Sequence, residues 1–284
     1  GLAPAPGLAP APGLAPAPGL APAPAPEVAV AAPSRPPLRT LPRGYRARIE
    51  DGIDDSGWPR AILAERDDST LSLVPEGTFI MGSNSGTSSE APAHRVRLRA
   101  YYIDQHEVTV DQFEKFLEQT GYRSLLPRNW TPTTGKTRPD PANPVVMVTF
   151  KDAQAYAEWC HRELPTEAQW EMAARSEASR LYPWGSEPID WDKPRGFHQI
   201  DPVKSFPQDV SAYGVFDLAG NAAEWTQDWY DSRHFLQLAG DVTVDPTGPA
   251  RGSRSLQRVV KGGGKNGAAS AREGVFQEKR LGHL

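Results

Sequence analysis

The stretch Asp217–Trp229, with the sequence DLAGNAAEWTQDW, decides how the rest of the chain is interpreted. Asp217 and Glu224 stand seven positions apart, and the Ala-Gly-Asn between them predicts a tight turn. Such a turn brings both carboxylates toward one point. The backbone carbonyls of Gly220 and Ala222 then join them in a shell of oxygen donors, which suits calcium better than a transition metal. A structural interpretation stays open, in which Asp217 caps a turn, Glu224 pairs with an arginine and the two tryptophans belong to the core.

Further sequence blocks accompany this stretch in a fixed order. They are PEGTFIMGS (Pro75–Ser83), YYIDQHEVTVDQF (Tyr101–Phe113), NPVVMVTFKDAQAYAEW (Asn143–Trp159), ELPTEAQWEMAAR (Glu163–Arg175) and YPWG (Tyr182–Gly185). Together the blocks resemble the sulfatase-modifying factor family, whose catalytic members are the formylglycine-generating enzymes. The resemblance implies an α+β fold, a C-type-lectin-like variant with little regular secondary structure.

Composition excludes several classes of function. The chain has 284 residues with 35 acidic and 31 basic side chains, so no basic patch argues for nucleic acid. No apolar run reaches membrane-spanning length. The single cysteine, Cys160, excludes an intrachain disulfide and a zinc site of several cysteines, and we expect it to be an inert core residue. Because many exported bacterial domains lack disulfides, the compartment is not predicted. Extracytoplasmic placement and tethering to a domain upstream of Gly1 both stay open.

Three segments are predicted from the uneven distribution of proline. Residues 1–43 begin with four copies of Gly-Leu-Ala-Pro-Ala-Pro and form an Ala/Pro-rich disordered tether, since frequent proline prevents helix and sheet hydrogen bonds. Residues 44–70 are a linker or an N-terminal extension. Residues 71–284 form the sulfatase-modifying-factor-like domain, which lacks the family's closing strand after Leu284 and is therefore expected to be truncated at its C-terminus.

Helix starts are predicted at three threonines. Thr109 and Thr166 have glutamine three positions later, which is capping-box spacing, and Thr149 has an aspartate in the expected first turn. Glu167 and Glu171 follow the third threonine, and we interpret them as partners of the helix dipole. Strands are predicted over 71–74, 78–81 and 96–103 from their alternation of polar and apolar residues.

The block that carries catalysis in the resembled family is altered here. The resemblance implies an Arg-Gly-Gly-Ser-Trp signature followed by two cysteines that bind copper(I) and oxidise a substrate cysteine to formylglycine. This chain reads KGGGKNGAASAREGVF from Lys261, and the two cysteine positions fall on Gly267 and Arg272. Neither side chain forms a thiolate, so we predict no catalytic residues and no copper site.

The same C-terminal block supplies the predicted ligand groove, which consists of Lys261, Lys265, Asn266 and Arg272 beside the insertion of residues 231–257. Two interpretations of Arg272 are open. It is either a cation that faces a ligand or a buried partner for an acid such as Glu224.

The resemblance also implies calcium sites. The family's second calcium shell falls on Asp217, Gly220, Ala222 and Glu224, the same set that the turn suggests. The first shell places Arg195 where the family has an aspartate, and a cation there repels calcium. We therefore expect one structural calcium ion.

The sequence thus predicts a pseudoenzyme: a non-catalytic binding or scaffold module, stabilised by calcium, for an unknown peptide, protein or small-molecule ligand. Two alternatives are a formylglycine-generating oxidase that acts on a sulfatase cysteine and a diversified ligand-binding protein. A third, an iron-dependent oxidase, lacks support because the six histidines show no metal-triad spacing.

Overall fold

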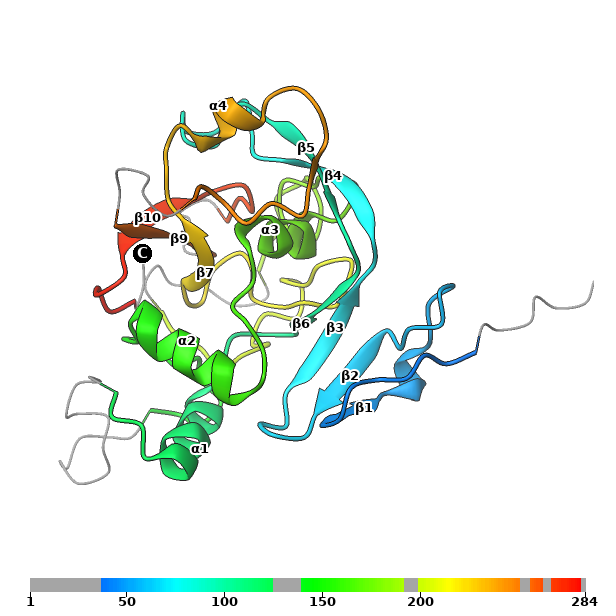
Figure 1. The fold of residues 1–284 in the computed structure, drawn as a ribbon, viewed down its shortest axis with the longest axis vertical. Coiled ribbons are helices and arrows are strands. Elements are labelled where there is room, and N and C mark those ends of the chain that lie inside the picture. Colours follow the sequence, from blue (N-terminus) through cyan, green and yellow to red (C-terminus); the bar gives the residue numbers. More distant parts are fainter. Residues whose placement is uncertain (1–36, 125–138, 192–198, 251–255, 263–266, 282–284) are drawn as a thin grey trace, which may run out of the picture. The chain divides into compact units, whose positions relative to one another are not determined.

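The computed structural model describes residues 37–124, 139–191, 199–250, 256–262 and 267–281 (Figure 1). Most of the predicted tether, residues 1–36, lies outside these ranges. The helices are η1 (Ile49–Asp51), α1 (Val110–Thr120), α2 (Phe150–Trp159), α3 (Glu167–Arg175) and α4 (His234–Leu238). The strands are β1 (Tyr45–Ala47), β2 (Ala61–Ala64), β3 (Thr70–Val74), β4 (Gly77–Met81), β5 (His94–Leu98), β6 (Tyr101–Asp104), β7 (Glu224–Trp229), β8 (Thr243–Val244), β9 (Gln257–Lys261) and β10 (Glu273–Phe276). Few helices and many short strands confirm the expected α+β fold.

The strands form three separate small sheets. One is antiparallel in the order β1-β2-β3-β6, and another is antiparallel in the order β10-β9-β7. The third has the order β4-β5-β8, with β5 and β8 parallel. Residues 45–64, part of the segment predicted as a linker or extension, thus contribute two strands to the first sheet.

The single strand predicted over 96–103 is wrong, because β5 and β6 belong to different sheets. Between them, the backbone N–H of Arg99 donates to Asp245 Oδ1 at 2.9 Å instead of to a neighbouring strand. An aspartate from the distant 231–257 insertion therefore ends β5, which a local alternation pattern does not reveal.

All three predicted helix starts are confirmed. The hydroxyls of Thr109, Thr149 and Thr166 each accept a hydrogen bond from the backbone N–H three residues later, and the reciprocal side-chain bonds complete the capping boxes. Each such cap is worth about 1 kcal/mol. Gly121 ends α1 in the left-handed conformation, with φ of 65°.

Helix α3 is the centre of the core. It packs against β4 and β5 on one side and β7 and β9 on the other, and it lies between these sheets in Figure 1. All its residues except Gln169 are buried, including Trp170 at 1% exposure. In the described residues no helix is both long and apolar enough to cross a membrane.

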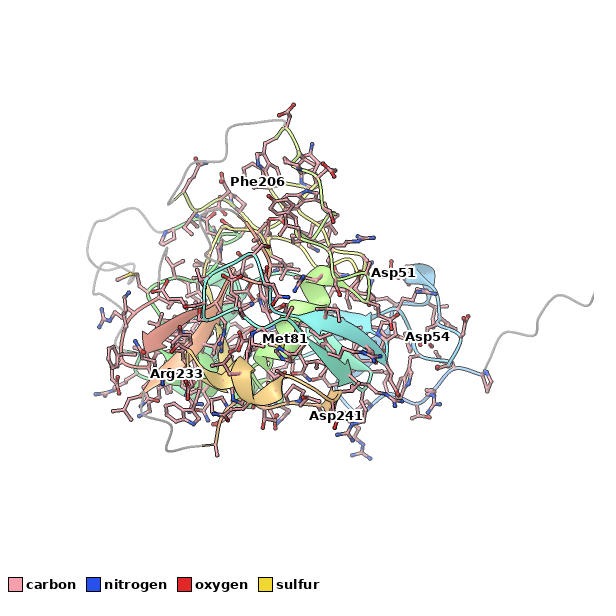
Figure 2. The ribbon with its side chains drawn as sticks, turned by 90° about the horizontal axis from the view of Figure 1, so that it is seen from above. Asp51, Asp54, Met81, Phe206, Arg233 and Asp241 are labelled. Atoms are coloured by element: carbon pink, nitrogen blue, oxygen red, sulfur yellow. The ribbon has the colours of Figure 1, made fainter. Side chains whose placement is uncertain are left out.

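Loops cover much of this core. Between α3 and β7, the described residues form turns, bends and isolated bridges rather than helices or longer strands. In Figure 2, Phe206, from this loop-rich segment, lies above the buried Met81, and Arg233, next to α4, lies to its left. Irregular loops of this kind are where binding residues are most often placed.

Candidate functional site

A cleft of about 480 Å³ lies where the C-terminal block meets the loop after β4. Its lining includes the hydroxyl-bearing residues Ser83, Ser85, Thr87 and Ser270 and the ring of Tyr182. Among the described residues of the lining, the only charged one is Glu90. The cleft is therefore suited to hydrogen bonding with a largely uncharged ligand.

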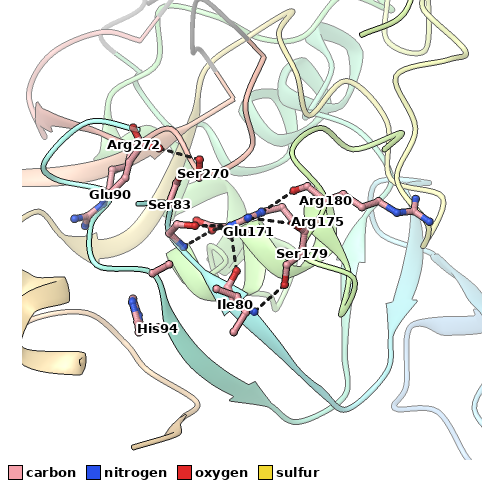
Figure 3. Close-up of polar contacts among 12 residues, drawn as sticks. Ile80, Ser83, Glu90, His94, Glu171, Arg175, Ser179, Arg180, Ser270 and Arg272 are labelled. Carbon is pink, nitrogen blue, oxygen red and sulfur yellow. Dashed lines mark hydrogen bonds and ion pairs between the residues drawn. The ribbon is translucent and has the colours of Figure 1, made fainter. Parts of the chain in front are cut away.

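The carboxylate of Glu90 links the two loops that form this cleft. Its Oε1 accepts hydrogen bonds from the backbone N–H and hydroxyl of Thr87, both at 2.9 Å, and its Oε2 accepts one from Ser270 at 2.8 Å. Glu90 is 5% exposed, so these bonds satisfy a buried carboxyl group and join the two loops across the cleft (Figure 3). The walls are thus fixed by the protein itself.

A buried ion cluster lies beneath the cleft. Glu171 Oε1 accepts from Arg175 at 2.6 Å and from the backbone N–H of Gly82 at 2.7 Å, while its Oε2 accepts from Lys261 at 3.0 Å (Figure 3). Burial alone raises the pKa of Glu171, but the charges of Lys261 and Arg175 outweigh it and hold the pKa below its usual value. The side chain of Lys261 is 0% exposed, so it contributes its charge to this cluster and not to a surface groove.

Arg272 is likewise a buried structural cation. Its guanidinium donates to both carboxylate oxygens of Glu167, at 2.7 and 2.8 Å, and its side chain is 0% exposed. The guanidinium lies 4.2 Å from the ring centre of Phe235 and 5.0 Å from that of Tyr230. The expected partner Glu224 is replaced by Glu167, which sequence analysis assigned to the helix dipole.

A second acid completes the surroundings of this pair. Asp228 Oδ2 accepts from the backbone N–H of Glu167 at 2.8 Å. Burial, with repulsion from Glu167, raises the pKa of Asp228 to about 7. Arg272 is therefore the cation that keeps a cluster of two buried acids stable.

The other residues of the altered block are placed as follows. Gly267 has φ of 63°, and a Cβ atom added there would lie 3.3 Å from the Cβ of Ala219. Lys265, Asn266 and Arg195 lie outside the described residues. Cys160 is 5% exposed at the end of α2, where its thiol donates to Asp67, and burial raises its pKa to about 12.

Of the predicted calcium residues, Asp217, Gly220 and Ala222 lie in the loop before β7, and Glu224 is the first residue of that strand. Asp217 and Ala222 are 1% and 4% exposed, and both Asp217 and Asn221 adopt positive φ, at 60° and 65°. A Cβ atom added at Gly262 would lie 3.3 Å from the carbonyl oxygen of Ala222 and 3.5 Å from Glu224 Oε1. Both oxygens therefore lie near Gly262.

Glu107 belongs to the same region, although sequence analysis did not single it out. Its Oε1 accepts from the backbone N–H of Ala222 at 3.1 Å, and its Oε2 is buried without a hydrogen-bond partner. Burial, with the charges of Asp217 and Glu224 adding to it, raises the pKa of Glu107 well above normal. Burial also raises the pKa of Glu224 to about 7.

The predicted ligands are hard oxygen donors, the type that calcium prefers. Buried carboxyl groups with raised pKa values gain most from a cation placed among them. In the described parts of the chain, no group of three or more His, Cys, Asp or Glu side chains could hold a metal ion. A calcium shell here therefore depends on the backbone carbonyls of Gly220 and Ala222 together with Asp217 and Glu224.

A larger groove, of about 740 Å³, lies along the first sheet. The rings of Tyr45, Trp58 and Tyr102 line it, together with Asp104 and Arg162. Arg162 donates to Asp104 at 2.6 Å and also pairs with Asp67, so the groove's polar end is an ion-paired cluster.

Comparison with known proteins agrees with the fold. The model of the "Sulfatase-modifying factor enzyme 1-like domain" family matches residues 62–280. The chain is 36% identical to a protein of Chlamydia pneumoniae named serine/threonine-protein kinase pkn1, over 76% of this chain and 35% of that protein. It is 30% identical to the formylglycine-generating enzyme of Bos taurus, over 80% of this chain and 74% of that enzyme.

Solved structures show the same fold. The structure of PvdO from Pseudomonas aeruginosa matches with a TM-score of 0.57 at 22% identity, covering 76% of this chain and 92% of that one. The chain spans about a third of the length of the kinase-named relatives. With a family model that matches most of its length, the chain belongs to the sulfatase-modifying factor enzyme 1-like domain family.

Proposed function

We propose that this domain is a non-catalytic binding or scaffold module. The observation that carries the proposal is the state of Arg272. At the position of the family's second cysteine stands an arginine whose side chain is fully buried and bonded to both oxygens of Glu167. The side chain at this position packs in the core and forms an ion pair. It has no thiol, so it cannot carry out a thiol-based redox step.

The remaining cysteine chemistry supports the proposal. Copper(I) needs soft sulfur ligands, and this chain has a single cysteine. The thiol of Cys160 is buried against Asp67 with its pKa raised to about 12, which keeps it protonated at neutral pH. We therefore propose that copper is not a cofactor of this chain.

The ligand surface is the 480 Å³ cleft beside the altered block. Its hydroxyl groups and the ring of Tyr182 offer hydrogen bonds and one apolar wall to a peptide, protein segment or small molecule. The relatives named as kinases contain the matching region as about a third of their length, which fits a domain that serves as an accessory module.

The proposed module contains one structural calcium ion, held by the side chains of Asp217 and Glu224 and the carbonyls of Gly220 and Ala222. Calcium would neutralise buried carboxyl groups and fix an otherwise irregular loop. Support comes from the position of the Ala222 carbonyl oxygen and Glu224 Oε1, which both lie near Gly262, and from the raised pKa of Glu224.

A second candidate function is a formylglycine-generating oxidase. The observation in its favour is that enzymes of this name are 30–32% identical over 67–80% of the chain. Oxidation of a substrate cysteine by this chain would then have to proceed without the two cysteines that bind copper(I) in the catalytic members of the family.

One experiment separates the two functions. The purified chain is incubated with copper(I), oxygen and a peptide that carries a sulfatase-type cysteine motif, and the peptide is followed by mass spectrometry. A formylglycine-generating enzyme serves as the positive control. The proposal predicts an unmodified peptide, whereas conversion of the cysteine to formylglycine establishes the oxidase.

A further inference from the structure

Glu107 is the buried acid that the proposed functions leave unused. It lies between β6 and α1, more than a hundred positions before the calcium loop, yet its Oε1 accepts the backbone N–H of Ala222 at 3.1 Å. That bond holds the peptide group between Asn221 and Ala222. The side chain is therefore attached to the same loop whose carbonyls the proposed ion needs.

The second oxygen of Glu107 has a different environment. Oε2 is buried without a hydrogen-bond partner, and the residue is 8% exposed. Burying an acceptor oxygen without a hydrogen bond destabilises the fold unless something bonds to it. Glu107 takes part in no ion pair within the described part of the chain, so no protein cation accounts for this carboxyl group.

Glu107 and Glu224 line one partly open pocket of about 150 Å³. The rest of its lining is mixed. Phe113, Val148 and Val215 are apolar, whereas Asp104, His106 and Arg162 are polar or charged. Since a water molecule needs about 10–15 Å³ of such volume, the pocket has room for water between the two carboxyl groups. Calcium takes six to eight oxygen ligands, so a shell of two carboxylates and two carbonyls leaves positions for water.

We infer that Glu107 is a positioning residue for the loop that holds the proposed calcium ligands, and that both of its carboxylate oxygens take part. Oε1 fixes the Asn221–Ala222 peptide beside the Ala222 carbonyl, and Oε2 accepts a hydrogen bond from water in the shared pocket. Once a cation is bound nearby, the ionised form of Glu107 also places a negative charge just outside the ligand shell. The inference rests on the proposed calcium ion and adds a residue outside the predicted shell.

The competing explanation is that Glu107 is only a structural acceptor for the loop. The variant Glu107→Gln distinguishes the two, because its amide oxygen still accepts the Ala222 N–H while the charge and the second acceptor oxygen are lost. Glu163→Gln is the matched control. Glu163 lines the same pocket but is exposed at the surface.

The experiment is a calorimetric calcium titration of the full chain after metal removal, for the wild type and both variants. Loss of a partner that orients a metal ligand typically weakens binding by about 10- to 100-fold, and we expect this for Glu107→Gln. Glu163→Gln should bind as the wild type does. Melting in EDTA gives the second measurement, in which Glu107→Gln should be no less stable than the wild type, because the loop hydrogen bond is kept.

Equal calcium affinity of Glu107→Gln and the wild type overturns the inference and leaves the calcium proposal intact. If the wild type itself binds no calcium, the calcium proposal fails, and the inference fails with it. Should Glu107→Gln not fold, Glu107→Asp replaces it, because it keeps the charge but draws the carboxylate away from Ala222. Weaker calcium binding by this variant supports the inference, and unchanged binding refutes it.

Discussion

Replacing Arg272 with methionine should strongly destabilise the domain. The change removes both hydrogen bonds to Glu167, at 2.7 and 2.8 Å, from a guanidinium with no solvent exposure. Glu167, itself 2% exposed, then has a buried charge without its cation, next to the buried acid Asp228. Breaking one side of a buried ion pair typically costs about 3–5 kcal/mol.

The assay is urea unfolding followed by tryptophan fluorescence at fixed pH and fixed calcium concentration. In thermal unfolding of a domain of this size, the same loss of stability lowers the melting temperature by roughly 6–20 °C. Arg97→Met is the matched control, because the pair between Arg97 and Glu76 is about half exposed. Exposed pairs contribute about 0–1 kcal/mol, so the control should be nearly neutral.

The double variant Arg272→Met/Glu167→Met tests the cause. Removing both charges leaves an apolar pair in a buried site, which is often neutral relative to the original ion pair. The double variant should therefore recover most of the stability that the single variant loses. A single variant that loses less than about 1 kcal/mol, or a double variant that is no better than the single, refutes the assignment of Arg272 as a buried structural cation.

Three further outcomes are expected. EDTA should lower the melting temperature of the wild type but not that of Glu224→Gln, and equal EDTA effects on both proteins count against the site. Calcium at a hundred times its dissociation constant should raise the free energy of unfolding of the wild type by about 2.7 kcal/mol. The pKa of Asp228 is raised to about 7, so the native state keeps a proton that the unfolded chain releases. The free energy of unfolding should therefore fall as the pH rises from about 4 to 7, less steeply in Asp228→Asn; identical slopes contradict this. The Cys160 thiol, buried and with its pKa raised to about 12, should react with a disulfide reagent only after unfolding in urea, and rapid labelling of the native protein would show that it is accessible.

Local signals allowed the helices to be predicted from the sequence. Thr109, Thr149 and Thr166 determine their helix starts through side chains three residues away, and the family blocks gave the fold. The strand boundary at Arg99 was missed because Asp245, which ends β5, lies 146 positions away.

The electrostatics of the core were not predictable for the same reason. Glu167 and Glu171 look like ordinary first-turn acids, but their partners Arg272 and Lys261 are 105 and 90 positions distant. Glu107 lies 115 positions from Ala222, so its role appears only in the folded chain. The sequence offered one signal for Glu107, which is its place between a strand and a helix cap within a family block.

The most direct test of the central claim is elemental analysis of the purified chain, before and after incubation with copper(I) and removal of unbound metal. The account predicts about one calcium per chain and no retained copper. Retention of one copper(I) per chain would contradict the account of Gly267 and Arg272 and indicate an oxidase.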